Sequence, residues 1–111
     1  MDSVTSPEAF TQYPGGDVFA RHVGTSFHAS AEEFGAMELE LTKVEMLSSS
    51  RLVSGGNSFS LMFFAAAGVS LPQGLYALEH ADLGRLDVFL VPLGPEKSGP
   101  RMRYEAVFNL A

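Results

Sequence analysis

The segment from Gly74 to Pro95 constrains the fold of this chain more than any other part. Two stretches that alternate apolar and polar residues, 75–80 and 85–93, flank the short sequence ADLG at 81–84. Alternation with a period of two is typical of a half-buried strand, and so short a connection can join only antiparallel strands. The segment therefore predicts a β-hairpin.

The same alternation recurs outside the hairpin. It predicts strands over 36–47, 58–66 and 102–110, and a short one at 26–28. No connection between them holds a helix long enough for a parallel crossover, which excludes βαβ units. We therefore expect a mainly β protein: an antiparallel meander of five to six strands that forms either a small barrel or a two-layer sandwich.

The strand 36–47 contains an irregularity, because its apolar positions shift by one residue within it. They are Met37, Leu39 and Leu41, and then Val44 and Met46. Such a slip is the pattern that a β-bulge produces. The alternative, that the strand ends at Thr42 and a turn follows, remains open at this point.

The chain begins with turn-forming residues. We expect residues 1–16 to be a flexible segment that can hold a helical turn through Phe10, and residues 17–111 to form a single β domain.

A short helix is predicted over 18–23. Asp17 is the expected N-cap, and Gly24 can end the helix in the left-handed conformation. Because so short a helix is not stable alone, it should dock on the sheet. The side chains expected to face inward are Val18, Phe19 and Val23.

Composition excludes several classes of protein. The net charge of −6 disfavours binding to nucleic acid. The absence of cysteine excludes disulfides and thiolate metal sites. The N-terminal stretch has no basic region followed by an apolar core, so we expect no signal peptide and a cytoplasmic location. The strongly apolar stretch 61–69 is about half the length of a membrane helix, so we expect no membrane association.

The histidines offer no recognisable metal motif. His22, His28 and His80 lack the spacing of a zinc site, and Glu79 and His80 point to opposite faces of one strand. A favourable interaction with the helix dipole explains His22. Either Glu79 or His80 can hold the turn that ends at Gly84. We therefore expect no metal and no cofactor.

A carboxylate pair is the nearest approach to a catalytic pattern. Glu38 and Glu40 share one strand face about 7 Å apart, a separation that carboxylate hydrolases use. The commoner source of alternating glutamates is a solvated strand face. No GxSxG motif is present. A hydrolase is therefore the weakest of the functions considered, and we expect no enzymatic activity.

Two non-enzymatic functions fit the sequence better. The apolar run 63–67 predicts a surface that a protein partner, a second copy or the N-terminal helical segment covers. The residues considered for interaction are Phe63, Phe64, Glu79 and His80. The alternative is a barrel that binds a small apolar molecule in a cavity. That cavity would be lined by Phe63, Tyr76, Phe89 and Tyr104.

Several motifs in the second half of the chain occur together. They are Phe-Ser-Leu at 59–61, Leu-Pro-Gln-Gly at 71–74, Tyr76, Leu-Glu-His at 78–80, Phe-Leu-Val-Pro at 89–92 and Tyr-Glu-Ala-Val-Phe-Asn at 104–109. In these motifs the chain resembles a family of small uncharacterised bacterial domains. The resemblance implies no catalytic residue. It associates the chain with phage-tail-like proteins, and so implies a structural role in an assembly.

Overall fold

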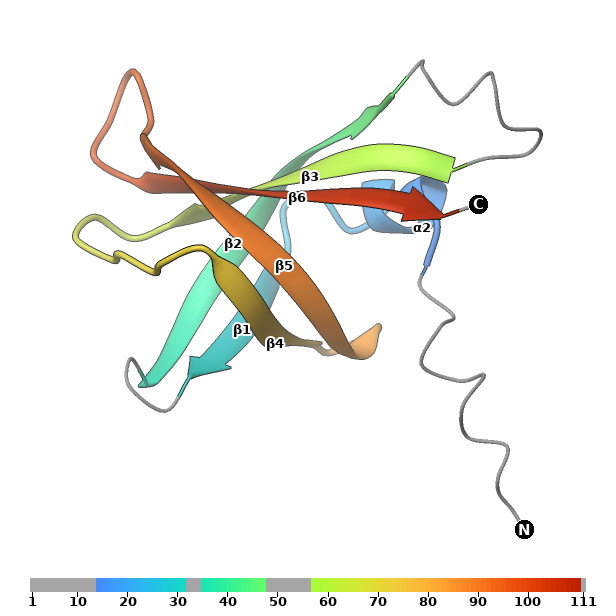
Figure 1. Ribbon diagram of the computed structural model, residues 1–111, viewed down its shortest axis with the longest axis horizontal. Coiled ribbons are helices and arrows are strands. Elements are labelled where there is room, and N and C mark those ends of the chain that lie inside the picture. Colours follow the sequence, from blue (N-terminus) through green and yellow to red (C-terminus); the bar gives the residue numbers. More distant parts are fainter. Residues whose placement is uncertain (1–13, 32–34, 48–56, 111) are drawn as a thin grey trace, which may run out of the picture.

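Six antiparallel strands close into a barrel (Figure 1). The computed structural model describes residues 14–31, 35–47 and 57–110. The strands, preceded by the helix α2 (Gly16–Ala20), are β1 (Ser26–Ala31), β2 (Gly35–Met46), β3 (Asn57–Ala65), β4 (Gly74–His80), β5 (Gly84–Pro95) and β6 (Met102–Leu110). The predicted mainly β, antiparallel class is confirmed, and the barrel is the correct one of the two architectures.

The strands follow one another around the barrel in the order β1-β2-β3-β6-β5-β4, and β4 pairs back with β1. Two three-stranded meanders, β1–β3 and β4–β6, are therefore joined by the connection 66–73. A fourth strand that returns beside the first of three hairpin-connected strands is the Greek-key arrangement. The predicted meander is therefore correct within each half, but between the halves the chain crosses over instead of continuing to the neighbouring strand.

The irregularity in β2 is a β-bulge. The pairing of β2 with β3 shifts between Leu41, which faces Phe63, and Lys43, which faces Met62. Beyond the shift, Val44 faces Leu61. The extra residue brings Val44 against the core beyond the slip, whereas Met46, at the end of the strand, is 58% exposed.

Alternate side chains of every strand fill the barrel. The buried apolar residues are Phe19, Phe27, Ala29, Leu39, Leu41, Phe59, Leu61, Phe63, Ala65, Leu71, Tyr76, Leu78, Leu86, Val88, Leu90, Tyr104, Ala106 and Phe108. Side chains already fill a barrel of eight strands, and six strands enclose less space. The barrel interior is therefore a packed core.

One of the four residues predicted to line a cavity lies on the wrong side for that role. Phe63, Tyr76 and Tyr104 point inward, whereas Phe89 is 48% exposed. Leu90, its neighbour on β5, takes the inner position, so the alternation of the strand turns Phe89 outward.

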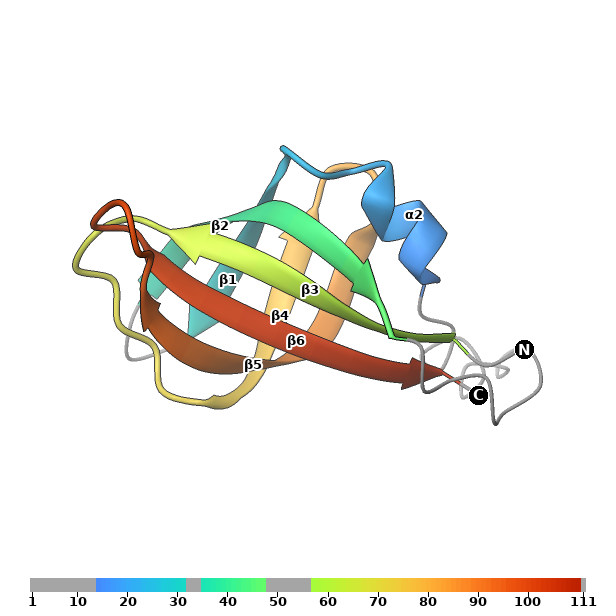
Figure 2. The ribbon, with the colours of Figure 1, turned by 90° about the horizontal axis from the view of Figure 1, so that it is seen from above.

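Helix α2 closes one end of the barrel (Figure 2). Its Phe19 is fully buried, and the Phe19 ring packs 5.8 Å from that of Phe59 and 5.7 Å from that of Phe108, measured between centroids. The Phe59 and Phe108 rings stack 5.0 Å apart. Tertiary packing of this one aromatic side chain holds a helix that is too short to be stable alone.

The predicted limits of this helix were wrong by a few residues. It begins at Gly16 with Gly15 at the N-cap, instead of beginning after Asp17. It ends before Val23, which is therefore 44% exposed instead of buried. The predicted left-handed glycine is confirmed: Gly24 has φ +92°, and its N–H donates to the carbonyl of Leu41.

The connection 66–73 closes the opposite end of the barrel (Figure 1). The Tyr104 hydroxyl accepts a hydrogen bond from the Leu71 N–H at 2.8 Å and lies 3.3 Å from the Val69 carbonyl, to which it donates. The Tyr76 hydroxyl donates to the Pro72 carbonyl at 2.6 Å. Two core tyrosines thus anchor the crossover by their polar ends.

Some predictions fall outside the residues that the structure describes. The helical turn through Phe10 is one of them, and the division of the chain at residue 16 stays a prediction. No helix in the described part of the chain is long and apolar enough to cross a membrane.

Candidate functional site

Three groups of side chains offer chemistry outside the packed core. They are a histidine cluster at the α2 end of the barrel, a polar hollow over β1, β2 and β3, and the outer face of the β4–β5 hairpin.

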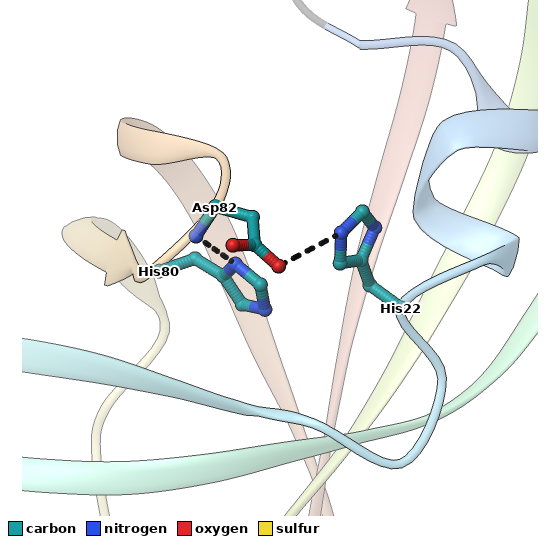
Figure 3. A group of neighbouring side chains, drawn as sticks. All are labelled: His22, His80 and Asp82. Carbon is teal, nitrogen blue, oxygen red and sulfur yellow. Dashed lines mark hydrogen bonds and ion pairs between the residues drawn. The ribbon is translucent and has the colours of Figure 1, made fainter.

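The histidine cluster joins two segments that lie far apart in the sequence (Figure 3). His22 follows α2, His80 ends β4, and Asp82 lies in the turn after it. The two imidazole rings meet edge-on with centroids 4.9 Å apart, and His22 Nε2 lies 3.5 Å from Asp82 Oδ2. The spacing of these residues in the sequence did not indicate that they converge. His28, the third histidine, is exposed on β1.

His80 is the hydrogen-bonding centre of this cluster. Its Nδ1 accepts from the N–H groups of Asp82 at 3.0 Å and Leu83 at 3.3 Å. Its Nε2 lies 2.8 Å from the hydroxyl of Thr25, which itself donates to the His22 carbonyl at 2.6 Å. Because the hydroxyl proton is used there, Nε2 must donate to it. His80 is therefore neutral, with its proton on Nε2. Of the two residues predicted to hold the turn, Glu79 and His80, it is His80 that does so.

The surroundings of His80 favour this neutral state. The residue is only 7% exposed. Burial lowers the pKa of His80 below its ordinary value of 6.5, the neighbouring His22 lowers this pKa further, and Asp82 acts in the opposite direction.

The cluster has the residue types of a metal site, since ligand atoms of His22, His80 and Asp82 lie within 4.8 Å of one another. A histidine that binds a metal through one nitrogen normally donates a hydrogen bond from the other. In His80 one nitrogen accepts two hydrogen bonds and the other already carries the proton, so no lone pair is left for a cation. His22 and Asp82 alone supply fewer ligands than a zinc site needs. The arrangement fits a hydrogen-bonded closure better than a metal centre.

The polar hollow has a volume of about 220 Å³. It is lined by Ser26, Glu38, Glu40, Phe64, Ala65, Ala66 and Arg101. The guanidinium of Arg101 lies 4.5 Å from the centroid of the Phe64 ring and 3.2 Å from a carboxylate oxygen of Glu40. The Ser26 hydroxyl donates to Glu38 at 2.6 Å.

This hollow places the predicted carboxylate pair on one wall. A glycosidase-type mechanism needs one acid held in an apolar, buried setting. Glu38 is exposed, and the Glu40 side chain is 43% exposed and paired with Arg101. The arrangement therefore offers a charged surface and lacks the burial that a general acid requires.

The outer face of the β4–β5 hairpin is apolar at the end away from its turn. We call its outward apolar side chains, Leu75, Ala77, Phe89 and Val91, the hairpin face. Leu75 and Phe89 are directly opposite each other across the two strands, and they are 68% and 48% exposed. Large apolar side chains in such a pair normally pack against another layer.

The four residues predicted for interaction lie in different environments. Phe63 is fully buried inside the barrel, and Phe64 lies on the outer side under Arg101. Glu79 is exposed, whereas His80 points inward, as predicted for neighbours on a strand. Helix α2 packs at the end of the barrel with its Phe19 against Phe59. Of the three ways considered for covering the run 63–67, a covering helix is therefore not provided by α2.

The hairpin face was missed, although the sequence carries a signal for it. On β5, Phe89 is in phase with Arg85 and Asp87, two charged residues that must face outward. The phase of the charges therefore predicts an exposed Phe89.

Comparison with known proteins gives one match. A model of a domain of unknown function, DUF6916, matches residues 16–108. The chain belongs to this family. The matched region runs from the start of α2 into β6, so it contains the histidine cluster, the hollow and the hairpin face. No curated protein and no solved structure matches the chain.

Membership of this family confirms the resemblance seen in the sequence and assigns no activity. Any statement about function must therefore rest on the geometry of the barrel itself.

Proposed function

We propose that this domain is a structural protein-interaction module that associates with a second copy of itself through the hairpin face. The exposed cross-strand pair Leu75–Phe89 carries the proposal. The centre of a protein interface is typically aromatic and depleted of charge, and charged residues stand at its rim. The hairpin face has this composition, because Asp87 lies opposite Ala77 at its edge, and Glu79 and Arg85 follow toward the turn.

Charge supports a second copy as the partner. The net charge of −6 makes two copies repel each other over most of their surface. Beside the hairpin face, Arg85 Nη2 lies 3.6 Å from Asp87 Oδ1, so the charges of these two side chains largely cancel. Two hairpin faces can therefore approach with little repulsion. Strand faces pack on one another about 10 Å apart, and a two-fold axis is the commonest symmetry for such a contact.

The contact is expected to be weak. Full burial of a leucine or phenylalanine side chain contributes about 1.5–3 kcal/mol, so the exposed parts of Leu75 and Phe89 contribute roughly 4–7 kcal/mol over two copies. Association costs at least about 4 kcal/mol. The difference corresponds to a dimer that forms only at high protein concentration.

A weak, repeated contact suits a subunit of a larger assembly, because several such contacts act together once the subunits are held close. A structural part of a phage-tail-like assembly is the role that we propose for the module.

Sedimentation velocity over a series of protein concentrations tests the proposal. The mass of the wild-type chain should rise with concentration, and a chain with Leu75→Ser and Phe89→Ser should stay monomeric. Phe64→Ser is the matched control, since Phe64 lies on another outer face, next to the polar hollow. This variant should associate like the wild type.

Two results would overturn the proposal. One is a wild-type chain whose mass is no higher than that of the Leu75→Ser, Phe89→Ser chain at any concentration up to about 10 mM, where a contact of this strength should be partly formed. The other is association that Phe64→Ser abolishes and the hairpin substitutions leave intact, which would move the contact to the hollow. The unfolding midpoints of all variants should be measured alongside, because Phe64 and Phe89 are partly buried and each substitution should cost about 1 kcal/mol, which leaves the chains folded.

A further inference from the structure

We propose that the hydrogen bonds of His80 form an acid-sensitive latch. The neutral imidazole of His80 holds the β4–β5 turn against the segment after α2, and protonation of the ring releases the turn. This inference is independent of self-association. It rests on the hydrogen bonds of one buried side chain that joins two parts of the chain.

The latch connects two segments through one ring. On one side, Nδ1 holds the N–H groups of Asp82 and Leu83 in the turn. On the other side, Nε2 bonds to Thr25, directly before β1. The ring also lies against Phe27, with centroids 4.5 Å apart, so it covers part of the core at the α2 end of the barrel.

Protonation is incompatible with this geometry. A proton added at Nδ1 would point at two N–H groups that also need an acceptor. Both hydrogen bonds from the backbone would be lost, and the N–H groups of Asp82 and Leu83 would face the new N–H of the ring. The ring can relieve this conflict only by leaving the turn, which also breaks the bond to Thr25. Protonation therefore acts on both sides of the latch at once.

The charged groups around His80 come from each element packed against it. His22, from the segment after α2, opposes a positive charge on His80, and Asp82, in the turn, favours it. The other charged groups and the remaining histidine of the neighbouring elements lie on the outside of the molecule, and they are Asp17 on α2, Arg21 directly after it, His28 on β1, Glu79 on β4, and Arg85 and Asp87 on β5.

Because burial and His22 lower the pKa of His80 below its ordinary value of 6.5, the neutral form dominates at neutral pH, and the charged form gains only as the pH falls below 6.5. As His80 takes up its second proton, the latch should open locally while the strands of the barrel keep their pairing. Local opening of this kind costs less free energy than global unfolding.

The test is NMR of the full-length, ¹⁵N-labelled chain between about pH 8 and about pH 5, the interval in which histidines titrate. At the upper end, ¹⁵N shifts of His80 should show an unprotonated Nδ1 and a protonated Nε2. As His80 gains its second proton, the exchange protection of the Asp82 and Leu83 amides should fall roughly tenfold or more, after correction for intrinsic exchange. The amide of Leu78, within β4, should keep its protection.

Three variants make the test specific. His80→Asn retains a side-chain oxygen that can accept from the N–H two residues later, and it cannot be protonated. Its turn amides should be protected at every pH. His22→Gln removes a neighbour that opposes protonation, so His80 should titrate at a higher pH. His28→Gln, at the exposed position on β1, should behave like the wild type.

The proposal is overturned if Nδ1 carries a proton at neutral pH, or if the protection of Asp82 and Leu83 is unchanged while His80 titrates. It is also overturned if His80→Asn retains the pH dependence, because another group would then be responsible.

Discussion

The two ends of the barrel are closed by different chemistry. At one end, tyrosine hydroxyls hold the crossover 66–73, and Leu71 is buried beneath it. At the other end, Phe19 of α2 plugs the core, and the imidazole of His80 ties the β4–β5 turn to Thr25. A phenol keeps its proton at physiological pH, whereas histidine titrates there. The crossover end should therefore be indifferent to pH, and the α2 end should respond to it.

The largest expected effect comes from the two apolar plugs. Phe19→Ala should lower the free energy of unfolding by about 3–5 kcal/mol, and Leu71→Ala by about 2–5 kcal/mol, because each leaves a cavity at one end of the core. Urea unfolding at neutral pH measures both. Phe89→Ala is the control of the same residue type on the outer face, and because Phe89 is only about half buried it should cost much less, about 1 kcal/mol. Equal losses for Phe19→Ala and Phe89→Ala would mean that α2 does not close the barrel.

The next effect concerns the tyrosine anchors. Tyr104→Phe should cost about 1–3 kcal/mol, because it leaves the N–H of the buried Leu71 without its acceptor. Tyr76→Phe removes the donor to the carbonyl of Pro72, a residue that is itself exposed, and should cost less. The cost of Tyr104→Phe should be the same at about pH 8 and about pH 5. A cost that changes with pH would contradict the contrast between the two ends.

The third prediction concerns the pH dependence of stability at the α2 end. Folding lowers the pKa of His80, chiefly by burial, so the unfolded chain takes up the proton more readily. The contribution of His80 to the free energy of unfolding should therefore be present in full above pH 6.5. It should be lost as the pH drops below 6.5 toward the pKa of His80 in the folded chain. Urea unfolding at several pH values measures this loss.

His80→Asn should remove this part of the pH dependence, at a cost near neutral pH of about 1 kcal/mol for the lost bond to Thr25. His28→Gln should leave the dependence in place. A wild-type stability that rises relative to that of His80→Asn on acidification below pH 6.5 would refute the assignment, since it would require His80 to be more easily protonated in the folded chain.

A last pair of substitutions should have the same effect at the two ends. Gly24, before β1, has φ +92°, and Gly68, in the crossover, has φ +85°. A Cβ at either position meets open space, so alanine there should cost only the backbone penalty of about 1–2 kcal/mol. Gly74→Ala, at a glycine without a positive φ and with ordinary space around it, should be neutral or slightly stabilising. Thermal unfolding of the three variants checks this order.

The sequence by itself determined the strands of this protein. The alternation of apolar and polar residues located all six within a few positions, and the phase slip near Thr42 indicated the bulge now seen between Leu41 and Lys43. These features are local, because the side-chain period of a strand and its turn residues depend on neighbours in the chain.

Only the tertiary structure decided the order of the strands and the composition of the sites. Which strands pair depends on packing between residues far apart in sequence, so the crossover that places β4 beside β1 left no local pattern. The meeting of His22 with His80, and of Arg101 with Glu40, follows from that order. The role of His80 is likewise tertiary, because an imidazole becomes a double acceptor only where a closed barrel buries it against a turn.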